Sequence, residues 1–425
     1  MKEPIRIAWF SDLSREGKHS RSLSSYVSKQ LLPILSKTFD IEVFSTFMGS
    51  FDAKEVRHFL TAFKRNKEKP FDIFFYQFED SPKSFFSRAH LALLPGVVWF
   101  HDFFLTNDGP EPLLNSSWED TVIKFNNAST EWAPMDKEYT RPKPQAYRES
   151  GMTFLPIFSS ERDHNEYKRV IEKKIEHANL RSFYLPIPCE LVKFQNIGTL
   201  DLKLLFCGSP KIEHRVHKLL QGLREARSEW SLIWLLEDEE LEKANELLRE
   251  FEISKVELRT PRSPELFAEL LKEARISIHM LFSVYGHLSP YLPLSLSSGL
   301  PCIVSDFASS SLLADNLVFK VQPGDNEASQ VSMLLDKLEA LGGPGSIDVA
   351  SKFANENHNP EVVAGELSAI LSNYAPKLAD AMKRWVALEQ DARRALSSWL
   401  LRNEERVCFK EAFEELGWIS QGETR

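Results

Sequence analysis

The sequence has few cysteines, and those it has are widely separated. Four occur in 425 residues, with no CxxC or Cys/His spacing, at Cys189, Cys207, Cys302 and Cys408. Neither a disulfide framework nor a zinc motif is therefore indicated. Cys207 and Cys302 lie in apolar runs, which predicts buried free thiols and a reducing compartment.

An excess of basic residues is also lacking. The net charge is −9, and acidic and basic residues are interspersed, so nucleic acid is not expected as a partner. The first residues, MKEPIRIAWF, lead into a strand-like run without the apolar core of a signal peptide. We therefore expect a cytoplasmic protein.

One long stretch carries no charge at all. No Asp, Glu, Lys or Arg occurs between Arg275 and Asp306, but Pro290, Pro293 and Pro301 interrupt the stretch. A membrane-spanning helix needs about 20 mostly apolar residues with its backbone satisfied internally, and this segment does not qualify. Its neutrality needs another explanation.

Strand-like and helix-like segments alternate along the chain, which predicts α/β domains with parallel sheets. In the first part we expect strands at 5–10, 40–46, 71–78, 96–100, 152–158 and 182–188, with helices at 22–38, 56–68 and 84–94. In the second part we expect strands at 202–208, 230–236, 255–259, 275–281, 300–306 and 317–321, with helices at 214–227, 237–251, 263–274, 330–341 and 360–375. An amphipathic helical tail follows from about residue 376.

The predicted fold is therefore two Rossmann-like, doubly wound domains that face each other across a cleft, plus a helical C-terminal tail. We place the domains at 1–187 and 188–358, and the C-terminal helices at 359–425, the first of them crossing back to the N-terminal domain. Ligands bind at the carboxyl ends of such sheets, where helix N-termini point.

Three segments resemble the family-4 retaining glycosyltransferases of GT-B fold. They are LLPILSKTFDIEVF (31–44), FDIFFYQFEDSPKSFF…LPGVVWFHDFFL (71–105) and SSGLPCIVSDFASSSLLADNLVFKVQPGD (297–325). The third is the most specific, and it includes Asp306 in the family's Ser-Asp position. The resemblance implies transfer of a sugar from a nucleotide-sugar donor to a glycan or lipid-linked acceptor with retention, and without a metal or other cofactor.

In this family a basic pair near the start of the second domain holds the donor diphosphate. Here that stretch is GSPKIEHRVHK (208–218). Gly208 allows a phosphate to approach the backbone closely, and Arg215 and Lys218 are the first cationic candidates, followed by Lys211. Helical spacing alone would also place Arg215 on a solvated face.

Two further places match the family's site. His101 follows a strand and precedes Asp102, and the resemblance implies that His101 faces the transferred sugar; a histidine satisfied within a turn is the alternative. Asp102 is the second catalytic candidate, as a residue that caps the turn or orients His101. In the family, a glycine in the loop that corresponds to 11–25 meets phosphate or acceptor. Here Gly17 is present in that loop, but Ser22 or Leu23 stands at the position of the family's glycine. Serines at a helix N-terminus either bind an anion or serve as an N-cap.

The largest departure from the family lies within the uncharged stretch. Relatives carry one or two glutamates there, whereas the aligned positions in this chain are Gly286, His287 and Leu294. The stretch thus resembles the cleft wall with its charges removed. His287 and Ser289 remain as candidate diphosphate contacts.

The missing glutamates and the extra tail support a second hypothesis. The chain would then be a catalytically inactive GT-B relative that serves as a binding or assembly subunit. The tail, with Trp385 and Trp399, is a candidate for docking on a protein partner or on the chain's own first domain. The apolar and basic helix within 57–69 is either a peripheral contact with the inner face of the membrane or a solvated face.

Overall fold

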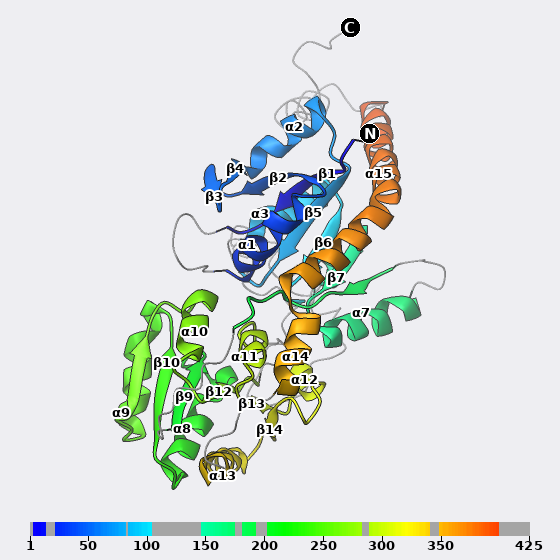
Figure 1. The fold of residues 1–425 in the computed structure, drawn as a ribbon. Helices are drawn as coiled ribbons and strands as arrows, with labels where there is room; N and C mark the ends of the chain where they lie inside the picture. Colours follow the sequence, from blue (N-terminus) through cyan, green and yellow to red (C-terminus); the bar gives the residue numbers. More distant parts are fainter. Residues whose placement is uncertain are drawn as a thin grey trace, which may run out of the picture. The chain divides into compact units, whose positions relative to one another are not determined.

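The structure is a computed structural model that describes residues 3–13, 22–81, 84–103, 146–174, 181–192, 202–282, 289–340 and 348–398. The chain divides into two compact units, Met1–Asn373 and Tyr374–Arg425. Both β-sheets belong to the first unit, and each is covered by helices (Figure 1).

Eight strands of the described residues form the first sheet in the order β3-β4-β2-β1-β5-β6-β7-β8. Their bounds are β1 (Arg6–Phe10), β2 (Asp40–Ser45), β3 (Gly49–Phe51), β4 (Lys54–His58), β5 (Ile73–Phe78), β6 (Val97–Phe100), β7 (Leu155–Phe158) and β8 (Phe183–Tyr184). All neighbours pair in parallel except β3 and β4. Central strands β1, β5 and β6 are buried along their whole length, which explains their continuous apolar runs.

Six strands of the described residues form the second sheet, all parallel, in the order β11-β10-β9-β12-β13-β14. Their bounds are β9 (Leu202–Cys207), β10 (Trp230–Leu235), β11 (Val256–Arg259), β12 (Ile276–His279), β13 (Cys302–Ser305) and β14 (Phe319–Val321). A core that includes Phe206, Leu219 and Trp234 packs between this sheet and its helices.

Helices cover both faces of such parallel sheets, as the strand–helix alternation predicts. The helices are α1 (Leu23–Leu35), α2 (Ala62–Glu68), α3 (Phe85–Leu93), α6 (Tyr147–Gly151), α7 (Glu161–Lys174), α8 (Val216–Glu225), α9 (Leu241–Glu250), α10 (Pro264–Leu271), α11 (Leu292–Ser298), α12 (Ala308–Ser311), α13 (Glu327–Ala340), α14 (Asp348–Asn357) and α15 (Pro360–Ser398). Short 3-10 helices are η1 (Phe59–Thr61), η3 (Ile212–His214) and η4 (Asp238–Glu240). The predicted fold class of two Rossmann-like domains with a helical C-terminal region is thus confirmed; the domain boundaries remain predictions.

The predicted helix at 56–68 is wrong over its first residues. The chain forms the β3–β4 hairpin there, turning at Asp52 and Ala53 with φ of 47° and 64°. Strand β4 then pairs in parallel with β2 from Val56 to His58, and α2 begins only at Ala62. Sheet pairing overrides the apolar spacing that resembled a helical face.

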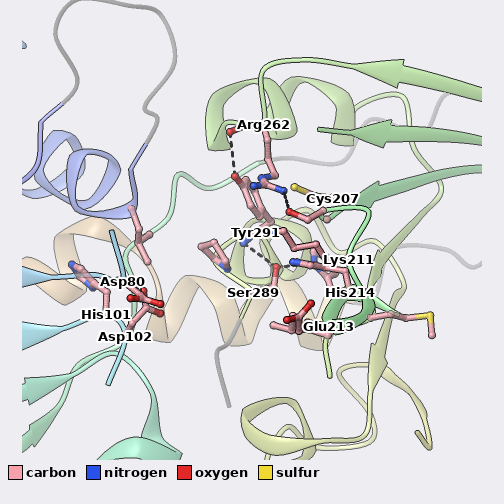
Figure 2. A pocket seen from close by; sticks show the side chains of 17 residues that line it. Asp80, His101, Asp102, Cys207, Lys211, Glu213, His214, Arg262, Ser289 and Tyr291 are labelled. Atoms are coloured by element: carbon pink, nitrogen blue, oxygen red, sulfur yellow. Dashed lines mark hydrogen bonds between the residues drawn. The ribbon is translucent and has the colours of Figure 1, made fainter. Parts of the chain in front are cut away.

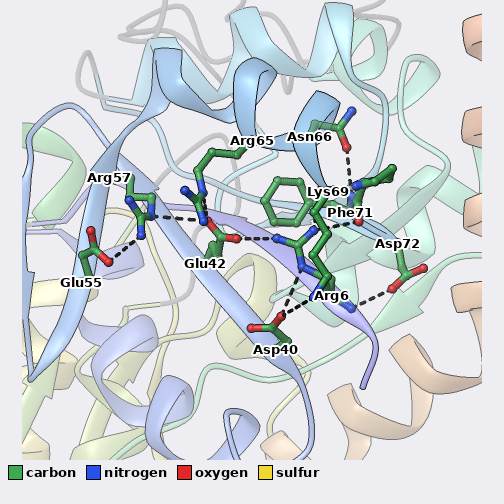
Figure 3. Close-up of polar contacts among 11 residues, drawn as sticks. Arg6, Asp40, Glu42, Glu55, Arg57, Arg65, Asn66, Lys69, Phe71 and Asp72 are labelled. Atoms are coloured by element: carbon green, nitrogen blue, oxygen red, sulfur yellow. Dashed lines mark hydrogen bonds and ion pairs between the residues drawn. The ribbon is translucent and has the colours of Figure 1, made fainter. Parts of the chain in front are cut away.

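A network of charged side chains lies at the amino ends of strands in the first sheet (Figure 3). Arg6, buried at the start of β1, pairs with Glu42 and with Asp40, the latter at 3.2 Å, and its backbone N–H donates to Asp72. Glu42 also pairs with Arg65 of α2. This network occupies the amino edge of the sheet, so the carboxyl edge remains for ligand binding.

No helix of the described residues is long and apolar enough to cross a membrane. Helix α15 continues through Pro376 to Ser398, beyond the predicted end at 375. Its residues from Tyr374 onward belong to the second unit, and a docking role of this tail remains a prediction.

Candidate functional site

A cavity of about 430 Å³ lies at the carboxyl ends of strands from both sheets. The first sheet contributes residues after β5 and β6, and the second contributes residues after β9 and β12 (Figure 2). The lining residues are Leu23, Asp80, His101, Asp102, Cys207, Gly208, Ser209, Lys211, Glu213, His214, Arg262, His279, Met280, Leu281, Ser289, Pro290 and Tyr291. The volume is within the range of about 300–1,000 Å³ that is usual for small-molecule sites.

His101 reaches this cavity as the sequence predicts, but both of its ring nitrogens face protein groups. Nε2 lies 2.7 Å from Gln77 Oε1, and Nδ1 lies 2.8 Å from Ser159 Oγ. Burial lowers the pKa of His101 to about 4, although the charge of Asp102 acts in the opposite direction. The imidazole is therefore neutral at pH 7.

Asp102 also lines the cavity, beside Asp80. Its carboxylate accepts a hydrogen bond from the Asp80 backbone N–H at 2.8 Å, so it orders the turn after β5. Glu79, which precedes Asp80, is only 5% exposed. Burial and the nearby charge of Asp12 raise the pKa of Glu79 to about 8, which makes this carboxyl largely protonated at pH 7.

Ser22 acts as the N-cap of α1. Its Oγ accepts from the Ser25 backbone N–H at 3.0 Å and donates to the Asp12 carbonyl at 2.7 Å. The Ser24 N–H donates to Glu79 at 3.0 Å, so protein groups take up two of the amides that an anion at this helix end would need. Gly17 lies outside the described residues.

Gly208 turns the chain at the end of β9 where a side chain does not fit. A Cβ at this position would lie 2.7 Å from both His214 Nδ1 and Phe206 Cζ. The Gly208 carbonyl accepts from Trp234 Nε1 at 2.8 Å. Gly208 lines the cavity, and its role in a phosphate-binding turn remains a prediction.

The structure does not place the two leading cationic candidates at the cavity. Arg215 Nε donates to Glu327 Oε2 at 3.0 Å and to Oε1 at 3.1 Å, and Glu327 is fully buried. Neither Arg215 nor Lys218 of α8 lines the cavity. The cations that line the cavity are instead Lys211 and Arg262, and no pattern in the sequence indicates the second.

Arg262 follows β11 and is neutralised by acidic neighbours. Its Nη1 lies 3.1 Å from Glu240 Oε2 and donates to Ser209 Oγ at 2.9 Å. In contrast, no carboxylate of the described residues forms an ion pair with Lys211, which is exposed. No spacing in the sequence signalled Arg262, because its partners lie more than 20 residues away.

The uncharged stretch contributes a buried hydroxyl and imidazole cluster. His279 Nε2 lies 2.8 Å from Ser277 Oγ and 2.9 Å from Ser295 Oγ, and Nδ1 lies 3.2 Å from Ser289 Oγ. Burial lowers the pKa of His279 to about 3. Ser289 lines the cavity. The feature of the sequence that could have indicated His279 is a histidine among serines within an uncharged, largely apolar stretch.

The two remaining candidates do not meet at this cavity in the described structure. Asp306 follows β13, accepts from Gln322 Nε2 and is not a lining residue. His287 lies outside the described residues. Among the described residues, no group of three or more His, Cys, Asp or Glu side chains is arranged to hold a metal ion.

No protein-family model matches the sequence, and a search of curated proteins finds no match. Solved structures do match. Sucrose-phosphate synthase from Thermosynechococcus elongatus has a TM-score of 0.62 at 12% identity, covering 87% of this chain and 98% of that one. HepE from Anabaena, in complex with UDP and glucose, has a TM-score of 0.58 at 12% identity, covering 87% and 100%.

WaaG, a glycosyltransferase involved in lipopolysaccharide biosynthesis, has a TM-score of 0.57 at 14% identity, covering 86% of this chain and 99% of that one. The likeness thus spans both sheets and nearly the whole length of each neighbour. At these identities it establishes the architecture and not the chemistry. The chain therefore has the GT-B fold that these glycosyltransferases share.

Proposed function

We propose that the protein is a family-4-like retaining glycosyltransferase that binds a nucleotide-sugar in the cavity between its two sheets. The observation that carries the proposal is the turn from Gly208 to Lys211, which brings backbone to the cavity from the second sheet together with a lysine that forms no ion pair among the described residues. HepE, a protein of the same fold, binds UDP and glucose. The acceptor would be a glycan or a lipid-linked sugar, as in polysaccharide biosynthesis.

Lys211 is the residue we assign to the donor diphosphate. The charge of Arg262 is already compensated by Glu240, and that of Arg215 by Glu327. Asp80 and Asp102 line the first-sheet side of the cavity, and Glu213 lies near Lys211 on the second-sheet side. A diphosphate would therefore settle on the second-sheet side, where a single carboxylate faces the cavity instead of two. Charged donors and backbone amides at that position stabilise the leaving diphosphate as the sugar departs.

Binding of UDP, GDP and ADP, measured by calorimetry, tests the assignment. Lys211→Met should weaken the preferred nucleotide by about 1.5–3 kcal/mol, or roughly 10- to 150-fold in Kd, because a charge-assisted hydrogen bond is lost. Lys218→Met, a change of the same type outside the cavity, is the control and should leave Kd within twofold. Equal effects of the two substitutions would remove Lys211 from the site, and no binding by any nucleotide would count against the proposal itself.

The second candidate is a catalytically inactive relative that acts as a binding or assembly subunit. It is supported by the cavity wall at 289–291, which carries Ser289, Pro290 and Tyr291 and no carboxylate. Incubation with radiolabelled UDP-glucose or GDP-mannose separates the two candidates. Slow release of free sugar by a nucleotide-binding protein favours the transferase, whereas binding without release over a day favours the subunit.

We infer a cytoplasmic setting from the buried free thiols Cys189, Cys207 and Cys302, since oxidising compartments favour disulfides. Exposed Leu60 and Phe63, beside the basic residues of α2, support a peripheral contact with the inner face of the membrane. Vesicle flotation with and without anionic lipid, comparing the chain with a Leu60→Ser/Phe63→Ser variant, tests that contact.

A further inference from the structure

A chain of buried polar groups runs through the first sheet and ends at the cavity. Trp9 Nε1 donates to Ser28 Oγ at 3.1 Å, and Ser28 Oγ donates to Ser11 Oγ at 3.0 Å. Gln77, fully buried on β5, contacts both serines and His101. In such a network, a group that can only donate or only accept determines which of its neighbours donates and which accepts.

The Ser24 carbonyl is that fixed member, because it can only accept. The Gln77 amide nitrogen lies 3.4 Å from the Ser24 carbonyl, 2.7 Å from Ser28 Oγ and 3.1 Å from Ser11 Oγ. A flipped amide would place oxygen against oxygen at Ser24 and abandon these donations. Gln77 Oε1 therefore faces His101 as an acceptor.

The direction at Gln77 determines the tautomer of His101. An amide oxygen cannot donate, so His101 Nε2 must carry the proton of the 2.7 Å contact. In a neutral imidazole the other nitrogen accepts, so Ser159 Oγ donates to Nδ1 at 2.8 Å. Both ring nitrogens are then satisfied inside the protein.

We propose that Gln77 is a positioning residue that holds His101 in the Nε2–H tautomer, so that the imidazole forms a fixed part of the cavity wall and exchanges no proton with a bound ligand. The inference gives His101 a role within the proposed nucleotide-sugar site and rests on that proposal for its functional meaning. Proton exchange with a ligand would require a ring nitrogen to leave Gln77 or Ser159, and the buried group left behind would lose its hydrogen-bond partner.

The surroundings of His101 also favour the neutral imidazole. The ring is 6% exposed, and Trp99 lies beside it, with ring centroids 5.0 Å apart. The carboxylate of Asp102 raises the pKa of His101, but burial outweighs it. The neutral form that Gln77 requires is therefore the form that burial favours.

Nitrogen-15 NMR of the full chain labelled at histidine tests the tautomer, with the His101 signals assigned by their loss in His101→Asn. We expect a protonated Nε2 and an unprotonated Nδ1 that do not change between pH 5.5 and 8. A protonated Nδ1, or a titration with a midpoint near the ordinary histidine pKa of about 6.5, would overturn the inference without any further variant.

A pair of variants tests Gln77 itself. In Gln77→Leu, Nε2–H would be buried without an acceptor, so the proton should move to Nδ1 and be donated to Ser159. Ser159→Ala is the matched control, because it removes the other partner and should leave Nε2–H in place. Near-ultraviolet circular dichroism checks that both variants fold, and an Nε2–H tautomer retained in folded Gln77→Leu would contradict the role of Gln77.

UDP added to the labelled wild-type chain separates this inference from the proposed function. Binding with unchanged His101 signals supports both. Binding that protonates His101 overturns the inference alone, because the ring would then exchange a proton. If neither UDP nor GDP nor ADP binds, the result counts against the proposed function, while the tautomer still decides whether Gln77 positions His101.

Discussion

At the scale of single residues, Arg215 shows how a cation predicted to bind ligand serves the fold instead. Its backbone is left-handed, with φ of 51°, which costs a non-glycine residue roughly 1–2 kcal/mol. Its guanidinium neutralises Glu327 at the start of α13 and lies 5.2 Å from the centre of the Phe282 ring. The sequence shows Arg215 and Glu327 112 positions apart, so neither helical spacing nor family resemblance reveals the pair.

Arg215→Ala should therefore destabilise the fold by about 3–5 kcal/mol, because it leaves the buried carboxylate of Glu327 without its countercharge, although the Gly324 N–H still lies 3.4 Å from Oε2. Unfolding in urea, followed by circular dichroism, measures this loss. Lys218→Ala on the same helix is the control and should cost less than about 0.5 kcal/mol. A loss below 1 kcal/mol for Arg215→Ala would mean that water or another group replaces the guanidinium.

At the scale of elements, Glu79 links the end of β5 to the first turn of α1 through the Ser24 N–H. Its pKa is raised from 4.5 to about 8 by burial and by Asp12, so between these values the folded chain holds a proton that the unfolded chain releases. The contribution of Glu79 to stability is therefore fully present below pH 4.5 and is lost as pH rises towards 8.

Glu79→Gln should make the unfolding free energy depend less on pH between about 4.5 and 8, because an amide resembles the protonated carboxyl and does not ionise. We expect the difference in unfolding free energy between wild type and variant to change by a few kcal/mol from pH 5 to pH 8, in favour of the variant at the higher pH. Urea unfolding at several pH values measures it, and parallel profiles would show that Glu79 is ionised in the folded chain.

The sequence predicts strands correctly where apolar runs are long, and it predicts the wrong element where pairing with neighbouring strands determines the conformation. The strands around Trp9, Phe75 and Trp234 were recognisable because parallel strands buried on both faces are continuously apolar. The hairpin before α2 was not, since β4 takes its conformation from β2 and β3 and not from its own sequence.

At the scale of the whole molecule, the alternation of strands and helices along the chain predicts two parallel sheets. Parallel topology in turn predicts that the site lies at the carboxyl ends of their strands. His101, Asp102, Gly208 and Ser289 reach the cavity for that reason. Arg262 and His279 could not be assigned, because partners from separate elements bring them there.

The two halves of the first unit also touch through a buried hydroxyl. Tyr26 of α1 accepts a hydrogen bond from the Glu190 backbone N–H at 3.1 Å, in the segment between the sheets. Tyr26→Phe should lower stability by about 1 kcal/mol, measured by urea unfolding. Ser36→Ala, at the other end of α1, is the comparison, and equal losses would show that the contact with Glu190 contributes nothing.

The pairing of Arg215 with Glu327 also constrains how this sequence can diverge. A chain that lost the arginine first would bury a carboxylate without its countercharge, and one that lost the glutamate first would keep the left-handed backbone of Arg215 without the ion pair that offsets its cost. We therefore expect the two positions to covary among homologues, either as a cation with an acid or as glycine at 215 with an apolar residue at 327.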